Sequence, residues 1–303
     1  MSDSIKVRKW LVLMALLATL AVVYLSWETP MAILFAVVTL SYTLPIFIWL
    51  DRLEPEPRAM RWNAFLWGAG VSTIVASTFN DLTTTFLGST IALIISAPII
   101  EETMKVLGIL SAAKRNHVDS PLDGAIYAGY VALGFASVEN VVYFSSAISE
   151  NEFGVTFIAR GLLSPLAHPY FSVFAGIFIG RSVLAGGSRK IAALKGLIIG
   201  IPLHAAWNMM TFNPVFAVLL IGHIGLFIVL VVKLKKMRQR EIKFVKSNVA
   251  KFVFTHNISP IELEIFGDLK ATRKMRRSLS KKDRRAFEER RSQITRQTLR
   301  LTK

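Results

Sequence analysis

The sequence of 303 residues contains no cysteine. This absence excludes disulfide bonds, a thiol nucleophile and thiolate metal sites, and it leaves the redox compartment undetermined. Charge is also scarce, because charged residues make up 18% of the chain against about 25% in ordinary soluble domains. Hydrophobic residues make up 53%, and the mean hydropathy is +0.48. Long stretches almost without charge predict that lipid is the solvent for most of the chain.

The formal net charge of +16 is unevenly distributed. Residues Lys233 to Lys303 hold 22 of the basic and 7 of the acidic side chains, whereas the preceding residues hold 14 and 13. The basic excess therefore belongs to the C-terminal tail and not to the apolar part of the chain.

Apolar runs bounded by charged or turn residues predict an all-α, polytopic membrane helix bundle. We expect a multi-pass protein of the cell membrane with about eight transmembrane helices. These lie at residues 10–27, 30–50, 62–79, 87–112, 122–148, 155–182, 192–211 and 214–233. The first run follows basic residues but has no small-residue cleavage site after it, so we interpret it as an uncleaved helix.

The loops between these runs differ in charge. Twelve Lys and Arg residues lie in loops on the side of the N-terminus, and the opposite loops, around Glu28, Asp81, Glu150 and Asn213, have none. The positive-inside rule then places both termini in the cytoplasm. We expect a membrane-embedded domain at 1–235.

Residues 236–303 are expected to form a basic, helical cytoplasmic tail. Start signals for two helices stand at Ser259-Pro260-Ile261-Glu262 and at Ser280. Phe287, Ile294 and Leu301 recur every seven residues among arginines. We interpret this as a solvated or membrane-surface helix that follows the anionic inner leaflet. No motif supports nucleic-acid binding.

Ionisable residues inside the predicted spans are few. A charge at mid-membrane costs roughly 3 kcal/mol on insertion scales, so such residues are functional candidates that face a polar interior. Those that lie away from the ends of the spans are Glu101, Glu102, Lys105, Glu139, Arg160, His168, His204 and His223. His223 has no polar residue within a turn on either side, and we interpret it as structural.

The spacing of these residues indicates a shared site. Glu101 and Lys105 are one helical turn apart and can pair, whereas Glu102 points toward a different neighbour. His204 and Asn208 also share a helical face, so the amide can fix the imidazole tautomer. Measured from the span ends, the Glu and His positions of four separate helices lie roughly 12–21 Å deep. One common layer favours one site over independent structural pairs.

Two chemistries fit this set of residues. In one, two histidines and a glutamate hold a divalent metal such as zinc while a second glutamate activates water. In the other, no metal is present: a glutamate activates water directly, and His204 with Asn208 stabilises the oxyanion. No His-Glu-x-x-His, Gly-x-Ser-Gly or Gly-x-Gly-Asp pattern is present to decide between them.

The motifs Glu101-Glu102-x-x-Lys105, Phe135-x-x-x-Glu139-Asn140, His168 and His204-x-x-x-Asn208, on successive helices, resemble the PrsW family of intramembrane proteases. Asp51-Arg52-Leu53-Glu54-Pro55-Glu56-Pro57 is similar to that family's early motif. From the residues alone, this acidic loop is also consistent with a stiff interfacial turn whose side chains lie in water.

The resemblance implies a peptidase that cleaves membrane-anchored proteins, such as an anti-sigma factor or a similar regulator. It implies Glu101 and Glu102 as catalytic carboxylates, and Glu139, His168 and His204 as metal ligands or polarising groups. Lys105, Asn140, Arg160 and Asn208 are then expected to support the site.

Three alternatives differ in class. A CAAX-type prenyl protease would have Arg one position after Lys105 and a histidine at 139, and neither is present. An ion-coupled transporter would use the carboxylates as relays, but the chain has no internal repeat with matching broken helices. A scaffold without chemistry, or an inactive relative, would leave the common depth of four polar positions to chance.

Overall fold

The structure is a computed structural model, and it describes residues 6–114, 117–210, 216–253, 258–266 and 268–299. Within these ranges every regular element is a helix, which confirms the predicted all-α class. The elements are α1 (Lys9–Leu25), α2 (Pro30–Leu50), α3 (Arg58–Leu66), η1 (Trp67–Ser72), α4 (Thr73–Leu87), α5 (Ser89–Ile91), η2 (Ala92–Ser96), α6 (Ala97–Ala113), α7 (Pro121–Ser149), α8 (Phe153–Thr156), η3 (Phe157–Leu163), α9 (Ala167–Leu184), α10 (Arg189–Met209), α11 (Phe216–Asn248), η4 (Val249–Phe252), α13 (Pro260–Ile265), α14 (Leu269–Ser278) and α15 (Lys281–Leu299).

The predicted spans overlap helices, although residues 211, 214 and 215 lie outside the described ranges. The predicted span 155–182 is interrupted between Leu163 and Ala167, and α4 continues past the predicted end at residue 79 to Leu87. Among the described residues, four helical segments are long and apolar enough to cross a membrane by themselves. They are Pro30–Leu50, Pro121–Ser149, Phe153–Leu184 and Arg189–Met209. The total of eight crossings and the orientation of the termini stay predictions.

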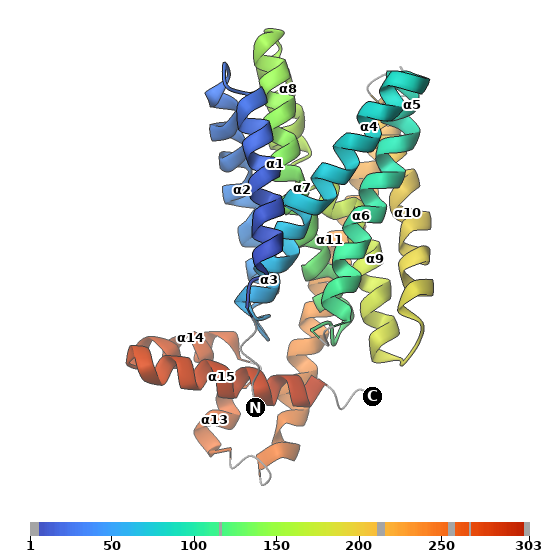
Figure 1. The fold of residues 1–303 in the computed structure, drawn as a ribbon. Helices are drawn as coiled ribbons and strands as arrows, with labels where there is room; N and C mark the ends of the chain where they lie inside the picture. Colours follow the sequence, from blue (N-terminus) through green and yellow to red (C-terminus); the bar gives the residue numbers. More distant parts are fainter. Residues whose placement is uncertain (1–5, 115–116, 211–215, 254–257, 267, 300–303) are drawn as a thin grey trace.

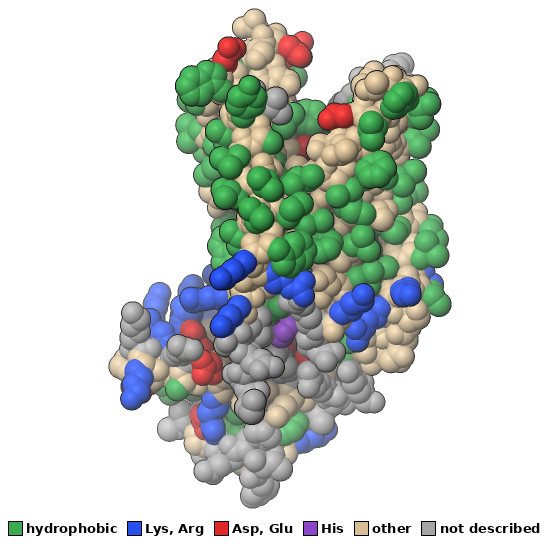
Figure 2. Space-filling model, viewed as in Figure 1, with side chains coloured by type: hydrophobic (Ala, Val, Ile, Leu, Met, Phe, Trp, Pro, Cys, Tyr) green, Lys and Arg blue, Asp and Glu red, His purple; other side chains and the backbone are tan. Residues whose placement is uncertain are grey.

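Two groups of helices diverge at the end of the bundle away from the tail (Figure 1). Helices α1, α2 and α8 rise on one side, and α4, α5, α6 and α10 rise on the other. Figure 2 shows apolar side chains over the outside of both groups and a hollow between them. Apolar surface of this extent is typical of helices that face lipid.

Helix α7 lies at the centre of the bundle and is buried over most of its length. It begins with a capping box between Ser120 and Asp123, and Pro121 occupies the first helical position. Gly124 of α7 faces Gly176 of α9 so closely that a Cβ on either would lie about 2 Å from the other's carbonyl oxygen. The absence of both side chains thus allows close contact between the two helices that carry Glu139 and His168.

The loop between α2 and α3 is buried, which contradicts its interpretation as a turn with acidic side chains in water. Glu56 is only 3% exposed, and its carboxylate accepts a hydrogen bond from the Tyr127 hydroxyl at 2.7 Å. Asp51 accepts from the Glu56 N–H and pairs with Arg61 at 2.6 Å. Burial raises the pKa of Asp51 to about 7 and raises that of Glu56 well above its ordinary value.

The tail folds back on itself instead of lying as isolated helices. Its two predicted helix starts are confirmed, since Ser259 caps α13 and Ser280 precedes α15. Ile294 is buried against Val249, Ile258 and Phe266, so that position of the predicted stripe packs within the tail, while Leu301 lies outside the described residues. Arg291 Nη1 donates to the Leu53 carbonyl at 2.6 Å, which joins α15 to the buried loop.

Candidate active site

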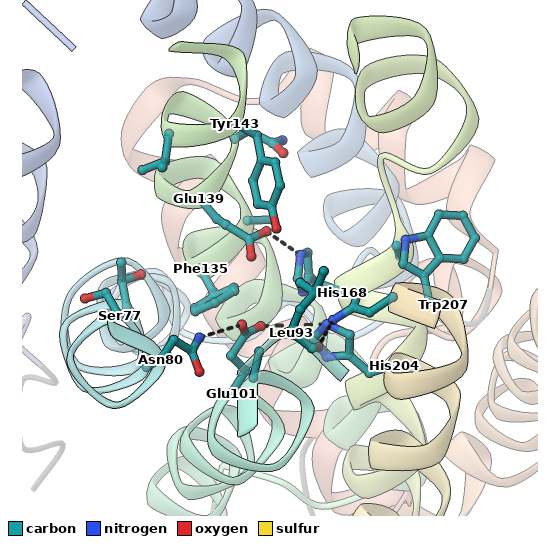
Figure 3. A pocket seen from close by; sticks show the side chains of 18 of the residues that line it. Ser77, Asn80, Leu93, Glu101, Phe135, Glu139, Tyr143, His168, His204 and Trp207 are labelled. Atoms are coloured by element: carbon teal, nitrogen blue, oxygen red, sulfur yellow. Dashed lines mark hydrogen bonds and ion pairs between the residues drawn. The ribbon is translucent and has the colours of Figure 1, made fainter. Parts of the chain in front are cut away.

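A cavity of about 430 Å³ lies between the two groups of helices. Its wall includes most of the residues that the sequence analysis selected, and Figure 3 shows several of them converging from different helices. Those that line it are Glu101, Glu139, Asn140, Arg160, His168, His204 and Asn208. The structure therefore brings together side chains that lie up to about a hundred residues apart in the sequence.

Helix α6 contributes three charged side chains, and they face different environments. Glu101 lines the cavity, whereas Glu102 and Lys105 lie behind its wall and are 1% and 0% exposed. The Lys105 ammonium donates to Glu102 Oε1 at 2.8 Å and to Glu101 Oε2 at 3.4 Å. A charge-assisted hydrogen bond is strongest at the shorter distance, so Glu102 is the principal counter-ion of Lys105.

Glu102 also holds the histidine of α10. Its carboxylate accepts from Ser172 Oγ at 2.6 Å and lies 3.0 Å from His204 Nδ1. A carboxylate only accepts, so Nδ1 carries the hydrogen and Nε2 keeps its lone pair. His204 Nε2 faces Glu101 Oε2 at 3.9 Å, and the Phe171 ring stacks on the imidazole at 4.7 Å. Glu102 is thereby the residue that orients His204.

The histidine of α9 has partners on both ring nitrogens. Its Nδ1 lies 3.0 Å from the Lys105 ammonium, and its Nε2 lies 2.7 Å from Glu139 Oε2. An ammonium only donates, so Nδ1 of His168 accepts and Nε2–H donates to Glu139. His168 is therefore held between a cation on α6 and a carboxylate on α7. Figure 3 shows the contact with Glu139.

Glu139 is held in turn by Arg160, which lies in the π-helix η3. The guanidinium pairs with Glu139, donates to Asn140 Oδ1 at 3.2 Å and lies 3.7 Å from the centre of the Tyr143 ring. π-Helical turns are rare and often mark functional sites, because they re-aim side chains within a helix. Neither the sequence pattern nor a helical wheel indicated this turn.

A second π-helix, η2, explains the position of Asn208. In a π-helix the carbonyl of residue i accepts from the N–H of residue i+5, and for Leu93 that residue is Pro98, which has no N–H. Asn208 Nδ2 donates to the Leu93 carbonyl at 2.8 Å. Its predicted support of His204 stays a prediction, since Glu102 is the residue that contacts Nδ1 of that ring. His223 Nε2–H donates to the Leu203 carbonyl oxygen at 3.0 Å, in keeping with a structural role.

Helix α4 lines the cavity with a polar face that the sequence analysis missed. Thr73, Ser77, Asn80 and Thr84 all line the cavity at helical spacing, and Asp81 joins them from within the helix rather than from a loop. The spacing i, i+4, i+7, i+11 was present in the sequence. Neutral hydroxyls and amides in an apolar run carry a weak signal, because Ser and Thr can bond their own helix carbonyls.

The donor set fits a divalent metal. Among the described residues, Glu101, His168 and His204 each offer one ligand atom, and these atoms lie within 4.8 Å of one another. Two imidazoles and a carboxylate with an open fourth position form a known catalytic zinc set. The set differs from the predicted one in that Glu101 stands in place of Glu139. Binding by His168 would replace either its Lys105 or its Glu139 contact.

Buried carboxylates and imidazoles around a cavity inside apolar helices are the groups that a membrane-embedded hydrolase needs to activate water. The chain belongs to the PrsW family: residues 56–234 match the family described as "PrsW family intramembrane metalloprotease". The resemblance stated from the motifs is thus confirmed, and the protein is a multi-pass protein of the cell membrane with intramembrane peptidase activity.

The relatives are named after the same family. The chain is 30% identical to "Protease PrsW" of Clostridioides difficile over 225 residues, which cover 69% of this chain and 94% of the relative. It is 30% identical to "Protease PrsW" of Geobacillus kaustophilus over 38% of this chain and 49% of the relative. For the Bacillus subtilis protein of that name the identity is 27%, over 40% and 54%. No solved structure matches the chain.

Proposed function

We propose that this protein hydrolyses peptide bonds of membrane-anchored proteins at the cavity, with Glu101 as the central residue of the reaction. The observation that supports this is the contrast among three carboxylates. Glu102 and Glu139 are engaged by short contacts to cations and histidines, whereas the two hydrogen bonds of Glu101 are long, at 3.4 and 3.5 Å. A carboxylate held loosely in a cavity keeps its electron pairs for a ligand or a proton.

In the metal-dependent form of the proposal, Glu101, His168 and His204 hold the ion. A divalent metal there would polarise the scissile carbonyl and favour ionisation of a bound water. Glu102 orients His204 through Nδ1, as hydrogen-bonded carboxylates do for metal-binding histidines. Asp81 and Glu139 are the other carboxylates on the cavity wall, and Glu139 lies 2.7 Å from His168. Glu139 would therefore take the proton from the attacking water and return it to the leaving amine.

A metal-free form is favoured by one contact. The Lys105 ammonium lies between Glu101 and His168, so a cation already stands beside the two residues. In this form Glu101 itself takes the proton from water. His204 donates to the developing oxyanion from Nε2, which requires a ring that carries a hydrogen on Nε2 as well as on Nδ1. Only the metal-dependent form makes Glu139 the base, so a variant of Glu139 distinguishes the two forms.

Zinc content and proteolysis, measured on the same purified preparations in detergent micelles, test the proposal. The metal-dependent form predicts about one zinc per chain, and loss of zinc and activity in Glu101→Gln. It predicts that Glu139→Gln keeps its zinc while the turnover of labelled casein falls about 10²- to 10⁴-fold. Wild type that is active without zinc and insensitive to chelators would establish the metal-free form. Full activity in Glu101→Gln would refute both.

The family implies that the substrates are membrane-anchored proteins. A membrane-anchored regulator such as an anti-sigma factor is what the resemblance implies. Figure 2 shows a hollow between the two groups of helices, and we infer that a segment from the surrounding bilayer reaches Glu101 through it. We expect the substrate's cut site to lie near the membrane surface away from the tail.

The tail is proposed to contact the anionic inner leaflet from the cytoplasmic side. Helix α14 exposes five basic side chains and no acidic one, namely those of Lys270, Arg273, Lys274, Arg276 and Arg277. Each Lys or Arg near an anionic surface contributes about 1 kcal/mol. Replacement of Lys270, Arg273 and Lys274 by Glu should abolish any preference of the purified protein for phosphatidylglycerol over phosphatidylcholine. An unchanged lipid preference would refute the contact.

A further inference from the structure

Asn80 on α4 is aimed at Glu101 by a chain of hydrogen bonds. Ser96 Oγ donates to Asn80 Oδ1 at 3.3 Å. Thr83 Oγ1 lies 3.0 Å from Ser96 Oγ, and its one hydrogen is shared with the Phe79 carbonyl oxygen at 2.8 Å. With its oxygen held by Ser96, the amide turns its NH₂ toward the cavity. There Nδ2 donates to Glu101 Oε1 at 3.5 Å, as the dashed line in Figure 3 marks.

The orientation of this amide is dictated by its neighbours. An ionised carboxylate has no hydrogen to donate, so only the NH₂ of an amide can face it. A flipped Asn80 would place two oxygens against each other and leave the Ser96 hydroxyl facing a donor. The Ser96 hydroxyl therefore fixes the amide in one state without any metal or substrate in place.

Asn80 contacts a different oxygen of Glu101 from the rest of the site. Oε1 accepts from Asn80, while Oε2 faces Lys105 at 3.4 Å and His204 Nε2 at 3.9 Å. One carboxylate oxygen is thus tied to α4, and the other is presented to the histidines. Among the described contacts, the hydrogen bond from Asn80 is the one that holds Glu101 Oε1 toward α4.

We propose that Asn80 is a positioning residue for Glu101, which sets the rotation of the carboxylate so that Oε2 faces His168 and His204. This rests on the role given to Glu101 above. Hydrogen-bond partners of metal-binding side chains typically change metal affinity or activity 10- to 100-fold when they are removed. The same orientation serves Glu101 as a ligand and as a proton acceptor, so the role of Asn80 does not depend on which form operates.

The test compares three variants in the full-length protein. Asn80→Leu is nearly isosteric and removes the donor, Ser96→Ala releases the amide, and Thr78→Val is the matched control. Thr78 lies on the same helix, is exposed, and bonds only its own helix at Ile74 O in the described contacts. Zinc affinity, kcat and KM for labelled casein, and Tm are measured for each.

For Asn80→Leu we expect zinc binding about 10- to 100-fold weaker and kcat lower by a similar factor, with KM and Tm unchanged. Ser96→Ala should also weaken zinc binding and lower kcat, but by a smaller factor. This variant replaces Asn80→Leu in the test if Asn80→Leu does not fold. Thr78→Val should match wild type. A merely structural role would instead lower Tm and leave the zinc affinity and kcat of the folded protein intact.

Zinc affinity and kcat within twofold of wild type in Asn80→Leu would overturn the inference. Glu101→Gln, measured alongside, separates the two levels of the argument. If Glu101→Gln is inactive while Asn80→Leu behaves as wild type, only the role of Asn80 falls. If Glu101→Gln keeps full activity, the proposed function itself is wrong. If wild type binds no zinc, the kcat of Asn80→Leu alone decides whether Asn80 positions Glu101.

Discussion

Replacement of Lys105 by methionine removes a cation that three site residues share. The ammonium is fully buried, and it lies 2.8 Å from Glu102 Oε1, 3.4 Å from Glu101 Oε2 and 3.0 Å from His168 Nδ1. Methionine fills a similar volume but carries no charge, so Glu102 is left as a buried anion with only Ser172 and His204 as partners. Removing one member of a buried pair costs about 3–5 kcal/mol.

That cost is measurable as a shift in Tm. At about 2–4 °C per kcal/mol for larger domains, Lys105→Met should lower the Tm of the protein in micelles by roughly 6–20 °C. Most of the loss comes from the charge left behind on Glu102 and not from packing. A double variant, Lys105→Met with Glu102→Gln, should therefore recover at least half of the loss.

The double-mutant cycle also gives the result that would refute the reasoning. If the losses of the two single variants simply add, the two side chains do not interact as the distance of 2.8 Å indicates. A Tm for Lys105→Met within about 2 °C of wild type would likewise contradict a buried ion pair.

Three further predictions concern helix contact, pH and the tail. Gly176→Ala would place a Cβ 2.1 Å from the Gly124 carbonyl oxygen, so α7 and α9 must separate by roughly 1 Å and activity should fall about 100-fold. Asp51 has a pKa raised from 3.8 to about 7 by burial, so its contribution to stability is full below pH 4 and is lost as the pH rises through 7. Wild-type Tm should fall between pH 5 and pH 8, and less so in Asp51→Asn. Arg291→Ala removes the bond to Leu53 O, and hydrogen exchange in residues 51–57 should rise roughly tenfold or more.

Each of these has its own control. Gly154→Ala, at a position where a Cβ would meet no atom within 4 Å, should match wild type in activity. For Asp51, a pH dependence of Tm that is the same in Asp51→Asn would assign it to other groups, including the neighbouring Glu56 and Asp123. For Arg291, exchange that rises equally across the whole chain would mean global destabilisation and not local opening.

Much of the site was predictable because charge in a lipid-facing run is costly. That cost selects Glu101, Glu139, His168 and His204 from an otherwise apolar chain, and their common depth predicts that they meet. Helix starts in the tail were predictable for a local reason, since the caps at Ser259 and Ser280 act within one turn.

The remaining features depend on packing between distant segments. The burial of Glu56 depends on Tyr127, seventy-one residues later, and no local pattern encodes that contact. The π-helix η2 depends on Pro98 together with an amide on α10. Asn80 is a neutral residue in a helix that already contains several hydroxyls, so its role emerges only when the geometry around Glu101 is known.

The central claim is that Glu101 carries the hydrolysis of membrane-anchored proteins. The most direct measurement compares the N-termini of membrane proteins in cells that express wild type or Glu101→Gln at equal levels. We predict new N-termini at or near single-pass segments that appear with wild type and are absent with Glu101→Gln. Identical N-terminal profiles in the two strains, under several stresses and with both proteins folded in the membrane, would contradict the claim.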